Sequence, residues 1–321
     1  MARILSVGAA LNDIYLIDHD DLTPTEIDNG ESIFGKILVG DKIDIDKLSF
    51  EVGGGGVNSA ISFARHGHET ILISNIAKDT AGDAILRTLN KEGVDTSYID
   101  YDEHKSTGSS IILLDSRKGE RTILTYRGAS SKYSNFNADD LDLIHPEYLY
   151  ITTMRGDLET LEKFLKKAHE IGAKVMFNPG VKELTEAKKL TSLLKYVDIL
   201  LVNKHEAGQI VPGETLEELL YHLKNYAHMV IITNGAMGGI ATDGEETYRF
   251  GIYEDVKMKD ATGAGDAFGS GFLAAIASKK SFRTAIAFAS ANSTSVVEKI
   301  GANKGILFGN EKLHPMPIQK I

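Results

Sequence analysis

The sequence predicts an α/β domain whose mostly parallel sheet carries helices on both faces. Short apolar runs and amphipathic segments alternate through the second half of the chain. The runs at 148–153, 175–178, 199–202 and 230–233 are typical of strands, and the segments between them at 158–171, 184–194 and 216–226 are typical of helices. Such alternation favours parallel strands joined by helices, with ligands at the carboxyl ends of the strands.

The first part of the chain follows a different pattern. An apolar run from Ile4 to Val7 ends at Gly8 and predicts a buried strand. Residues 34–50 alternate partly between apolar and polar, and 108–115 and 121–126 form a β-rich pair around a turn. Both patterns are typical of half-exposed strands, so we expect strands in both places, the second pair as a hairpin.

The composition limits the classes of function. The chain has 321 residues, 42% of them hydrophobic, which is enough for one large α/β domain or for two domains. A formal charge of −10 argues against nucleic acid as a partner. There is no cysteine, which excludes disulfides and thiol nucleophiles. No apolar run approaches the ~18 residues of a membrane span, and residues 1–8 lack the apolar segment of a signal peptide, so we expect a soluble, cytoplasmic protein.

The most informative stretch is Asp260-Ala-Thr-Gly-Ala-Gly-Asp266, which precedes an apolar helical pattern. Small residues before a helix leave its first N–H groups unpaired, and with the helix dipole these groups form an anion site. An acid at Asp266 suits a base that takes a proton from a hydroxyl while the N–H groups stabilise a transferred phosphoryl group. The alternative is that Asp266 only complements the helix dipole. The small residues Gly263, Ala264 and Gly265 favour the base.

This stretch resembles the signature of the PfkB, or ribokinase-like, family of carbohydrate kinases, and further motifs of that family follow in order along nearly the whole chain. The resemblance implies that Asp266 is the catalytic base and that Gly263, Ala264 and Gly265 form the anion hole. It implies one domain over 1–321 with a ribokinase-like three-layer fold. A small β-sheet lid would come from about 17–52 and 106–127.

Two further stretches resemble the substrate site of the family. In a Gly-x-x-x-x-Asp pattern, Asp13 would bind sugar hydroxyls. The four glycines that precede Asn58 give a flexible joint and let a ligand approach the backbone. The resemblance assigns three residues of this joint to the substrate, namely Gly54, Gly55 and Asn58. Ribokinase itself has an asparagine where Leu11 stands, which argues against ribose.

Two arginines suggest a substrate that carries an anion. Arg155 follows the expected strand 148–153, and Arg127 lies where the lid returns to the core. The guanidinium fork matches carboxylate and phosphate groups. Family members that act on 2-keto-3-deoxygluconate also use arginines near the sugar acid. The alternative is that Arg127 and Arg155 form surface ion pairs.

The resemblance also implies a site for ATP. The strand 230–233 and the glycine turn after it resemble an ATP-site segment, with Thr233, Gly235 and Gly238 as contacts. Asn292 would line the adenine pocket, or would lie on a helix surface.

Metal ions are implied at two places. Asn203 and Glu206 either begin a helix, with Asn203 as its cap, or form the family's Asn-x-x-Glu motif, which organises Mg²⁺ largely through water beside ATP. Asp260 and Thr262, with the loop 299–305, resemble a site for a monovalent cation such as K⁺.

We therefore expect transfer of the γ-phosphoryl group of ATP to a hydroxyl of a small sugar or sugar acid. A nucleoside kinase shares this fold and every motif above, so it is the first alternative. The second is a non-catalytic sugar or nucleotide sensor on a kinase scaffold, against which Asp266 and Glu206 argue. Lids with exposed strand edges often pair, which predicts a homodimer through the lid.

Overall fold

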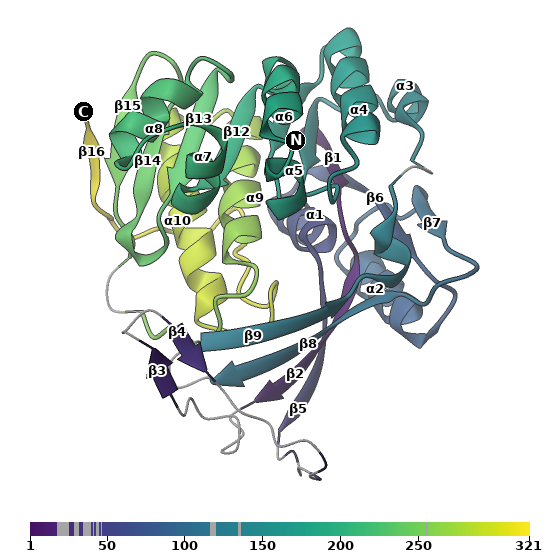
Figure 1. Cartoon of the computed structure of the whole chain (residues 1–321). Helices are drawn as coiled ribbons and strands as arrows, with labels where there is room; N and C mark the ends of the chain where they lie inside the picture. The colour runs from purple at the N-terminus through teal and green to yellow at the C-terminus, as the bar shows by residue number, and fades with distance from the viewer. Residues whose placement is uncertain are drawn as a thin grey trace.

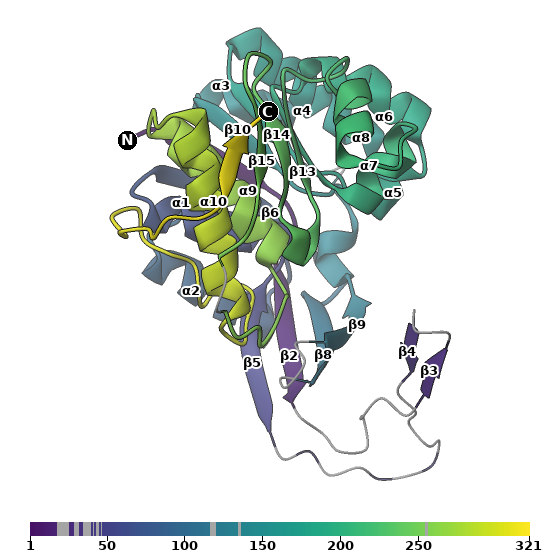
Figure 2. The same ribbon diagram turned by 90° about the vertical axis from the view of Figure 1, so that its left-hand side faces the viewer.

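A large sheet with helices on both faces forms the frame of the molecule, and a smaller sheet projects from one end of it (Figure 1). Figure 2 shows the same arrangement edge-on, with the helices in separate layers on either side of the large sheet. The computed structural model describes residues 1–17, 26–28, 32–34, 40, 42, 45, 47–115, 120–133, 136–253 and 256–321. In this part of the chain, no helix combines the length and apolar character needed to cross a membrane.

The large sheet has ten strands, and its central part is parallel. In spatial order the strands are β16 (Ile318–Lys320), β15 (Thr247–Phe250), β14 (Gly239–Thr242), β13 (Met229–Thr233), β12 (Ile199–Asn203), β11 (Lys174–Phe177), β10 (Tyr148–Ile151), β1 (Arg3–Val7), β6 (Glu69–Ile76) and β7 (Ile99–Tyr101). Strands β13 to β7 are parallel, and β14, β15 and β16 are antiparallel additions at one edge. The chain runs outward from β1 in one direction and later from β10 in the other. The carboxyl ends of β1 and β10 therefore flank a topological switch point, where α/β sheets bind ligands.

Alternating side chains bury both faces of this sheet. On β10, Leu149 and Ile151 pack into one core, whereas Tyr150 between them packs into the other. The first core is covered by α3 (Leu141–Ile144), α4 (Leu158–Ile171), α5 (Val181–Leu184), α6 (Ala187–Leu193), α7 (Lys204–Ile210) and α8 (Leu216–Leu223). The opposite face is covered by α1 (Gly55–Arg65), α2 (Thr80–Lys91), α9 (Ala264–Ala277) and α10 (Phe282–Val297). The predicted three-layer α/β architecture is confirmed.

The small sheet has four strands, in the order β5 (Leu48–Gly53), β2 (Leu11–Ile17), β8 (Gly108–Asp115) and β9 (Glu120–Tyr126). The predicted hairpin of β8 and β9 is present. Strand β2 was not part of the expected lid segments, yet it pairs with both β5 and β8 because the chain leaves β1 after only a short connection. The short hairpin of β3 (Glu26–Asp28) and β4 (Ser32–Phe34) stands apart, and most of the segment 18–47 lies outside the described residues.

One face of the small sheet turns toward the large sheet. Its inner side chains Tyr15, Ile17, Ile112 and Leu114 form a separate apolar cluster, against which Ile300 packs from the loop after α10. The outer face carries a row of apolar side chains that the pairing register aligns across all four strands, namely Phe50, Ile14, Ile111 and Leu124. Phe50 and Leu124 are 64% and 55% exposed.

Helix α9 is seated on the sheet by a glycine. A Cβ on Gly269 would lie 2.3 Å from the Tyr150 hydroxyl and 2.7 Å from a methyl group of Leu201. Both neighbours are buried, so neither can move without disturbing the core. The absence of a side chain at this position sets how closely α9 approaches β10 and β12.

We expect Gly269→Ala to lower the free energy of unfolding by about 1–3 kcal/mol, because the added methyl group overpacks a filled core. Urea unfolding followed by circular dichroism measures the change. The matched control is Gly208→Ala within α7, where a Cβ would meet nothing within 4 Å. There the better helix propensity of alanine should stabilise by about 0.5–1 kcal/mol. Equal effects at the two positions would contradict the packing argument.

Candidate active site

Glycines bring α1 against the carboxyl ends of β1 and β10. A Cβ on Gly56 would lie 2.6 Å from the carbonyl carbon of Gly8, and one on Gly55 would lie 3.0 Å from the Thr152 side chain. Gly54 has a φ of 95°, which a residue with a side chain rarely adopts. Gly54 and Gly55, predicted as substrate contacts, therefore also have a structural role. They let the first turn of α1 sit directly on the switch point.

The predicted base lies at the start of α9. Gly263 caps the helix with a φ of 79°, and a Cβ there would lie 2.5 Å from the Ala302 carbonyl oxygen. Gly265 faces open space, since a Cβ on it would meet nothing within 4 Å. The first N–H groups of α9 have no partner within the helix. Asp266 in this turn accepts a hydrogen bond from Asn58 Nδ2 over 2.9 Å, so two residues predicted from separate motifs are in contact.

Burial makes the carboxylates of this region more basic. It raises the pKa of Asp266, and the hydrogen bond from Asn58 partly opposes this rise. Asp13 on β2 is 4% exposed. Burial is the main reason why its pKa rises to about 7, a hydrogen bond with Ser110 lowers it, and the nearby charges of Asp260, Asp266 and Glu51 raise it further. Asp13 and Asp266 are therefore close enough for their charges to interact.

A cleft beside the start of α9 joins the predicted nucleotide residues to the predicted anion hole. It has a volume of about 150 Å³ and opens to solvent. Thr233, Gly235 and Gly238 line it together with Ala264 and Gly265 of α9. The other lining residues are Phe250, Gly251, Ile252 and Phe268, and the hydroxyl-bearing Ser290, Ser293 and Thr294 of α10. A planar base and a phosphate chain both suit such a cleft.

Asn292 does not line this cleft. It is fully buried within α10, where its Nδ2 donates to the Ala267 carbonyl over 2.8 Å and its Oδ1 accepts from Leu307 N over 2.8 Å. Both ends of the amide are thus used to join α10 to α9 and to the loop after α10. The expected contact of Asn292 with adenine is therefore wrong, and so is the alternative that Asn292 lies on a helix surface. The α10 residues that reach the cleft are Ser290, Ser293 and Thr294.

The Asn-x-x-Glu motif forms a capping box at the start of α7. Asn203 Oδ1 accepts from Glu206 N, and Glu206 Oε2 accepts from Asn203 N, each over 2.9 Å. Asn203 also pairs with Thr233 in the register of β12 and β13, which puts α7 beside the cleft. The second oxygen of Glu206 has no protein partner among the described residues, and burial raises the pKa of this carboxyl. A carboxylate oxygen left free beside a nucleotide cleft fits a water-mediated Mg²⁺.

Asp260 is buried under the small sheet. It is fully buried and accepts hydrogen bonds from Thr262 N over 2.9 Å and from Gly301 N over 3.1 Å. The Thr262 hydroxyl is buried without a partner in the described part of the chain. Arg121 of β9 places its Nε 4.0 Å from Asp260. A buried carboxylate and an unpartnered hydroxyl fit a small cation, but Arg121 already brings positive charge to the same place.

Arg127 and Arg155 are close enough for their charges to interact. Burial lowers the pKa of Arg127, and the charge of Arg155 lowers it further. Neither arginine forms an ion pair with any described residue. The alternative of surface ion pairs is therefore not what the structure has. Arg155 itself has a φ of 60°, and its N–H donates to Thr153 Oγ1 over 3.1 Å.

The turn that carries Arg155 is held by a buried acid. Glu183 is fully buried, and its carboxylate accepts from the Thr153 hydroxyl and from the N–H groups of Gly156 and Gly180 over 2.9–3.1 Å. Glu183, Arg121 and Ser110 were not predicted, because none stands in a recognisable motif. Apart from Gly180, their partners are far away in the chain, and only the fold brings them together.

Comparison with known proteins settles the family. A family model described as pfkB family carbohydrate kinase matches residues 1–307. The chain belongs to the pfkB family. It is a sugar-kinase type of phosphotransferase, with an alcohol group as acceptor. The predicted family and enzyme class are confirmed.

Individual kinases are similar to this chain over most of their own length. A ribokinase of Lactococcus lactis is 28% identical over 308 residues, covering 95% of this chain and 94% of the relative. A nucleoside kinase of Methanocaldococcus jannaschii is 28% identical over 229 residues, covering 70% and 71%. The structure of Arabidopsis thaliana ribokinase complexed with ribose and ATP is similar with a TM-score of 0.78 at 23% identity, covering 96% of each chain. The ribokinase-like fold is confirmed.

The pKa of Asp13 predicts a pH-dependent effect of Asp13→Asn on stability. Below pH ~4 the carboxyl is protonated in both the folded and the unfolded chain. As pH rises to about 7, the unfolded chain ionises more readily, so Asp13 costs the folded state free energy. At pH 8 the variant should gain up to about 4 kcal/mol in stability, and the gain should vanish near pH 4.

Thermal unfolding between pH 4 and pH 8 measures this effect. Asp83→Asn on α2 is the control, because Asp83 is exposed and the substitution should change stability little at any pH. A stability gain for Asp13→Asn that did not grow with pH would contradict the assignment.

Proposed function

We propose that this pfkB kinase transfers the γ-phosphoryl group of ATP to a hydroxyl of a small sugar or sugar acid. One observation carries the proposal. The first turn of α9 is shared by two sites, since Ala264 and Gly265 line the nucleotide cleft and Asp266 faces Asn58 and Asp13 on the other side. A phosphoryl group and an acceptor hydroxyl would meet at this turn.

Each residue at the turn has a separate task. Asp266 accepts the proton of the acceptor hydroxyl, and its raised pKa makes it a stronger base than an exposed aspartate. The N–H groups from Gly263 to Gly265 stabilise charge on the transferred group. Asp13 and Asn58 bind the substrate, with Gly54 and Gly55 allowing close approach. Glu206 and Asn203 would hold Mg²⁺, which neutralises charge on the phosphates when bound.

The small sheet acts as a lid in this proposal. Glu51 of β5 pairs with Lys304 over 2.5 Å, and Arg121 of β9 approaches Asp260, so both edge strands are tied to loops next to α9. In this position the lid, whose strand β2 carries Asp13, keeps water from the phosphoryl group.

Asp266→Asn tests the base. The amide keeps the size of the side chain but cannot accept the proton, so turnover should fall about 10²–10⁴-fold while the protein stays folded. ADP release from Mg-ATP in the presence of the acceptor measures it, with circular dichroism as the control for folding. Near-normal turnover would exclude Asp266 as the base.

The two arginines favour an acceptor that bears a carboxylate or phosphate. Arg127 and Arg155 bring two positive charges together on the substrate side, with no carboxylate partner within ion-pair distance among the described residues. An anionic substrate would supply that partner. We therefore place sugar acids first and neutral sugars second.

Arg155→Ala separates these substrates. It should raise KM about 10–100-fold for the sugar acid, because a charge-assisted hydrogen bond is lost. KM for a neutral sugar, measured side by side, should change little. An equal rise in KM for both substrates would mean that Arg155 shapes the site without binding an anion.

A nucleoside kinase remains the second candidate, favoured by the similarity to the nucleoside kinase described above. A panel of 2-keto-3-deoxygluconate, fructose, fructose phosphates, ribose, adenosine, inosine and cytidine distinguishes the candidates by ADP release. Turnover of a nucleoside alone would replace the sugar. Binding of ATP without turnover of any compound would favour a sensor.

Two finer points belong to the same proposal. Asp260 and Thr262 would hold K⁺, and equal rates in K⁺ and in an organic-cation buffer would instead assign the charge balance to Arg121. The exposed apolar row on the lid would pair with a second copy to form a homodimer, and a monomer mass in light scattering would exclude this. A cytoplasmic location stays a prediction.

A further inference from the structure

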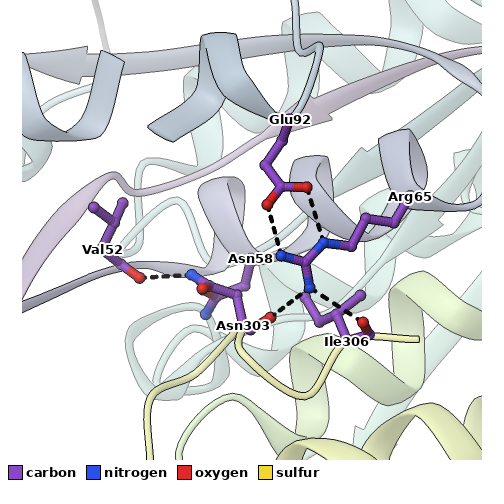
Figure 3. Close-up of polar contacts among 6 residues, drawn as sticks. All are labelled: Val52, Asn58, Arg65, Glu92, Asn303 and Ile306. Carbon is purple, nitrogen blue, oxygen red and sulfur yellow. Dashed lines mark hydrogen bonds and ion pairs between the residues drawn. The ribbon is translucent and has the colours of Figure 1, made fainter. Parts of the chain in front are cut away.

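A chain of hydrogen bonds reaches Asp266 through Asn303 and Asn58, and Figure 3 shows Asn58 and Asn303 with the neighbours of Asn303. Asn58 Nδ2 donates to Asp266 Oδ2 over 2.9 Å. Asn58 Oδ1 accepts from Asn303 Nδ2 over 3.2 Å, and the same Nδ2 donates to the Val52 carbonyl over 2.6 Å. Asn58 and Asn303 are 2% and 9% exposed, so neither amide can turn to water for a substitute partner.

The order of donors along this chain determines which way the Asn58 amide points. An amide has one oxygen that only accepts and one nitrogen that only donates. Because Asn303 offers its NH₂ group, Asn58 must present its oxygen to Asn303 and its own NH₂ group to Asp266. The turned amide would place two NH₂ groups against each other and an oxygen against the carboxylate. Asn303 therefore selects the orientation of Asn58 that favours an ionised Asp266.

Asn303 is in turn fixed by an ion pair between two helices. Arg65 Nη1 donates to the carbonyl oxygens of Asn303 and Ile306 over 2.9 and 3.1 Å. Its Nε and Nη2 donate to the two carboxylate oxygens of Glu92 over 2.9 and 2.6 Å. This bidentate pair is only 15% and 20% exposed. Figure 3 shows the guanidinium between Glu92 and the loop 303–306, and each of its three nitrogens donates a hydrogen bond.

Helix geometry explains why α1 carries both Asn58 and Arg65, the residues on either side of Asn303 in this series of hydrogen bonds. Asn58 and Arg65 are seven residues apart on α1, which is close to two turns, so their side chains leave the same face. Both therefore meet the loop after α10. Asn303 also contacts the lid, because its hydrogen-bond acceptor Val52 belongs to β5.

We propose that Asn303, held in place by the Arg65–Glu92 pair, is a positioning residue that keeps the Asn58 amide donating to the Asp266 carboxylate. The proposal rests on the proposed function, in which Asp266 is the base. The donation from Asn58 lowers the pKa of Asp266 against the burial that raises it. Loss of the donation should thus shift activity to higher pH as well as weaken the base's orientation.

Other ionisable groups face Asp266 and remain in every variant. Asp13 approaches from β2, and Tyr150 from β10. The pKa of Asp13 is about 7, so its ionisation also shapes the pH profile. The effect of a substitution is therefore taken as the difference between its profile and that of the wild-type protein.

The experiment is a double-mutant cycle on the full chain, with Asn58→Ala, Asn303→Ala and the double variant. Asn303→Ala should lower kcat about 10-fold and move the acid limb of kcat upward by about one pH unit. KM for ATP should stay within about twofold, because the ATP cleft is untouched. In the Asn58→Ala background, Asn303→Ala should change kcat and the acid limb little, because its route to Asp266 is already cut.

Arg65 is tested against a matched arginine. Arg3 also combines a carboxylate, Glu69, with a backbone carbonyl, that of Ile144, but it lies at the opposite end of β1. Arg65→Ala and Arg3→Ala should both lower the melting temperature, and only Arg65→Ala should move the acid limb. Arg65→Lys keeps the charge without the fork and should lie between wild type and Arg65→Ala, which keeps the test valid if an alanine variant does not fold.

Three results would overturn the proposal. The first is an unchanged kcat and acid limb in folded Asn303→Ala. The second is a double variant whose fold loss of kcat equals the product of the two single losses. The third is identical pH profiles for the Arg65 and Arg3 variants. Failure of the proposed function is distinguishable, since it requires turnover by Asp266→Asn. If that variant is inactive while Asn303→Ala behaves as wild type, only the positioning role fails.

Discussion

Contact between backbones at the switch point is the constraint on which the rest of the site depends. Gly8 and Gly56 touch where β1 meets α1, and Gly263 touches Ala302 where the loop after α10 meets α9. A side chain at either place would push a helix away from its neighbour. Asn58 lies in the first turn of α1 and Asp266 in the first turn of α9, so their hydrogen bond survives only if both helices keep these positions.

The same closeness gathers negative charge in a place poor in water. The charges of Asp260 and Asp266 act on Asp13, which lies on the small sheet, and burial opposes the ionisation of Asp13 and Asp266. A fold selected for stability alone would avoid this arrangement. Perturbed carboxylates in a cleft are instead typical of sites that move protons. Positive groups stand around the edge, with Arg121 at Asp260 and Lys304 at Glu51. They balance the charge without neutralising Asp266.

Sequence reasoning succeeded where the signal is local. The strands and helices from β10 to β13 follow from periodicity, and α4 spans the predicted residues 158–171. The anion hole, inferred from small residues before a helix, stays a prediction. Strand β2 was not predicted as part of the lid, because an alternating pattern indicates a half-exposed strand but not the sheet to which the strand belongs. Asn292 was misplaced because position on a helix does not tell whether an amide faces a cleft or a neighbouring helix, and here α9 uses both of its ends.

The sequence by itself determined the fold class and the pfkB family and predicts Asp266 as the base, because each depends on residues that are close in the chain and on a backbone geometry that short motifs encode. Only the tertiary structure decided the partners. Asn303 meets Asn58, Arg121 meets Asp260, and Arg65 meets the loop after α10 across long stretches of chain. A charged or amide side chain can pair with many others, and its choice is fixed only when packing brings one partner within hydrogen-bonding distance and excludes water from the rest.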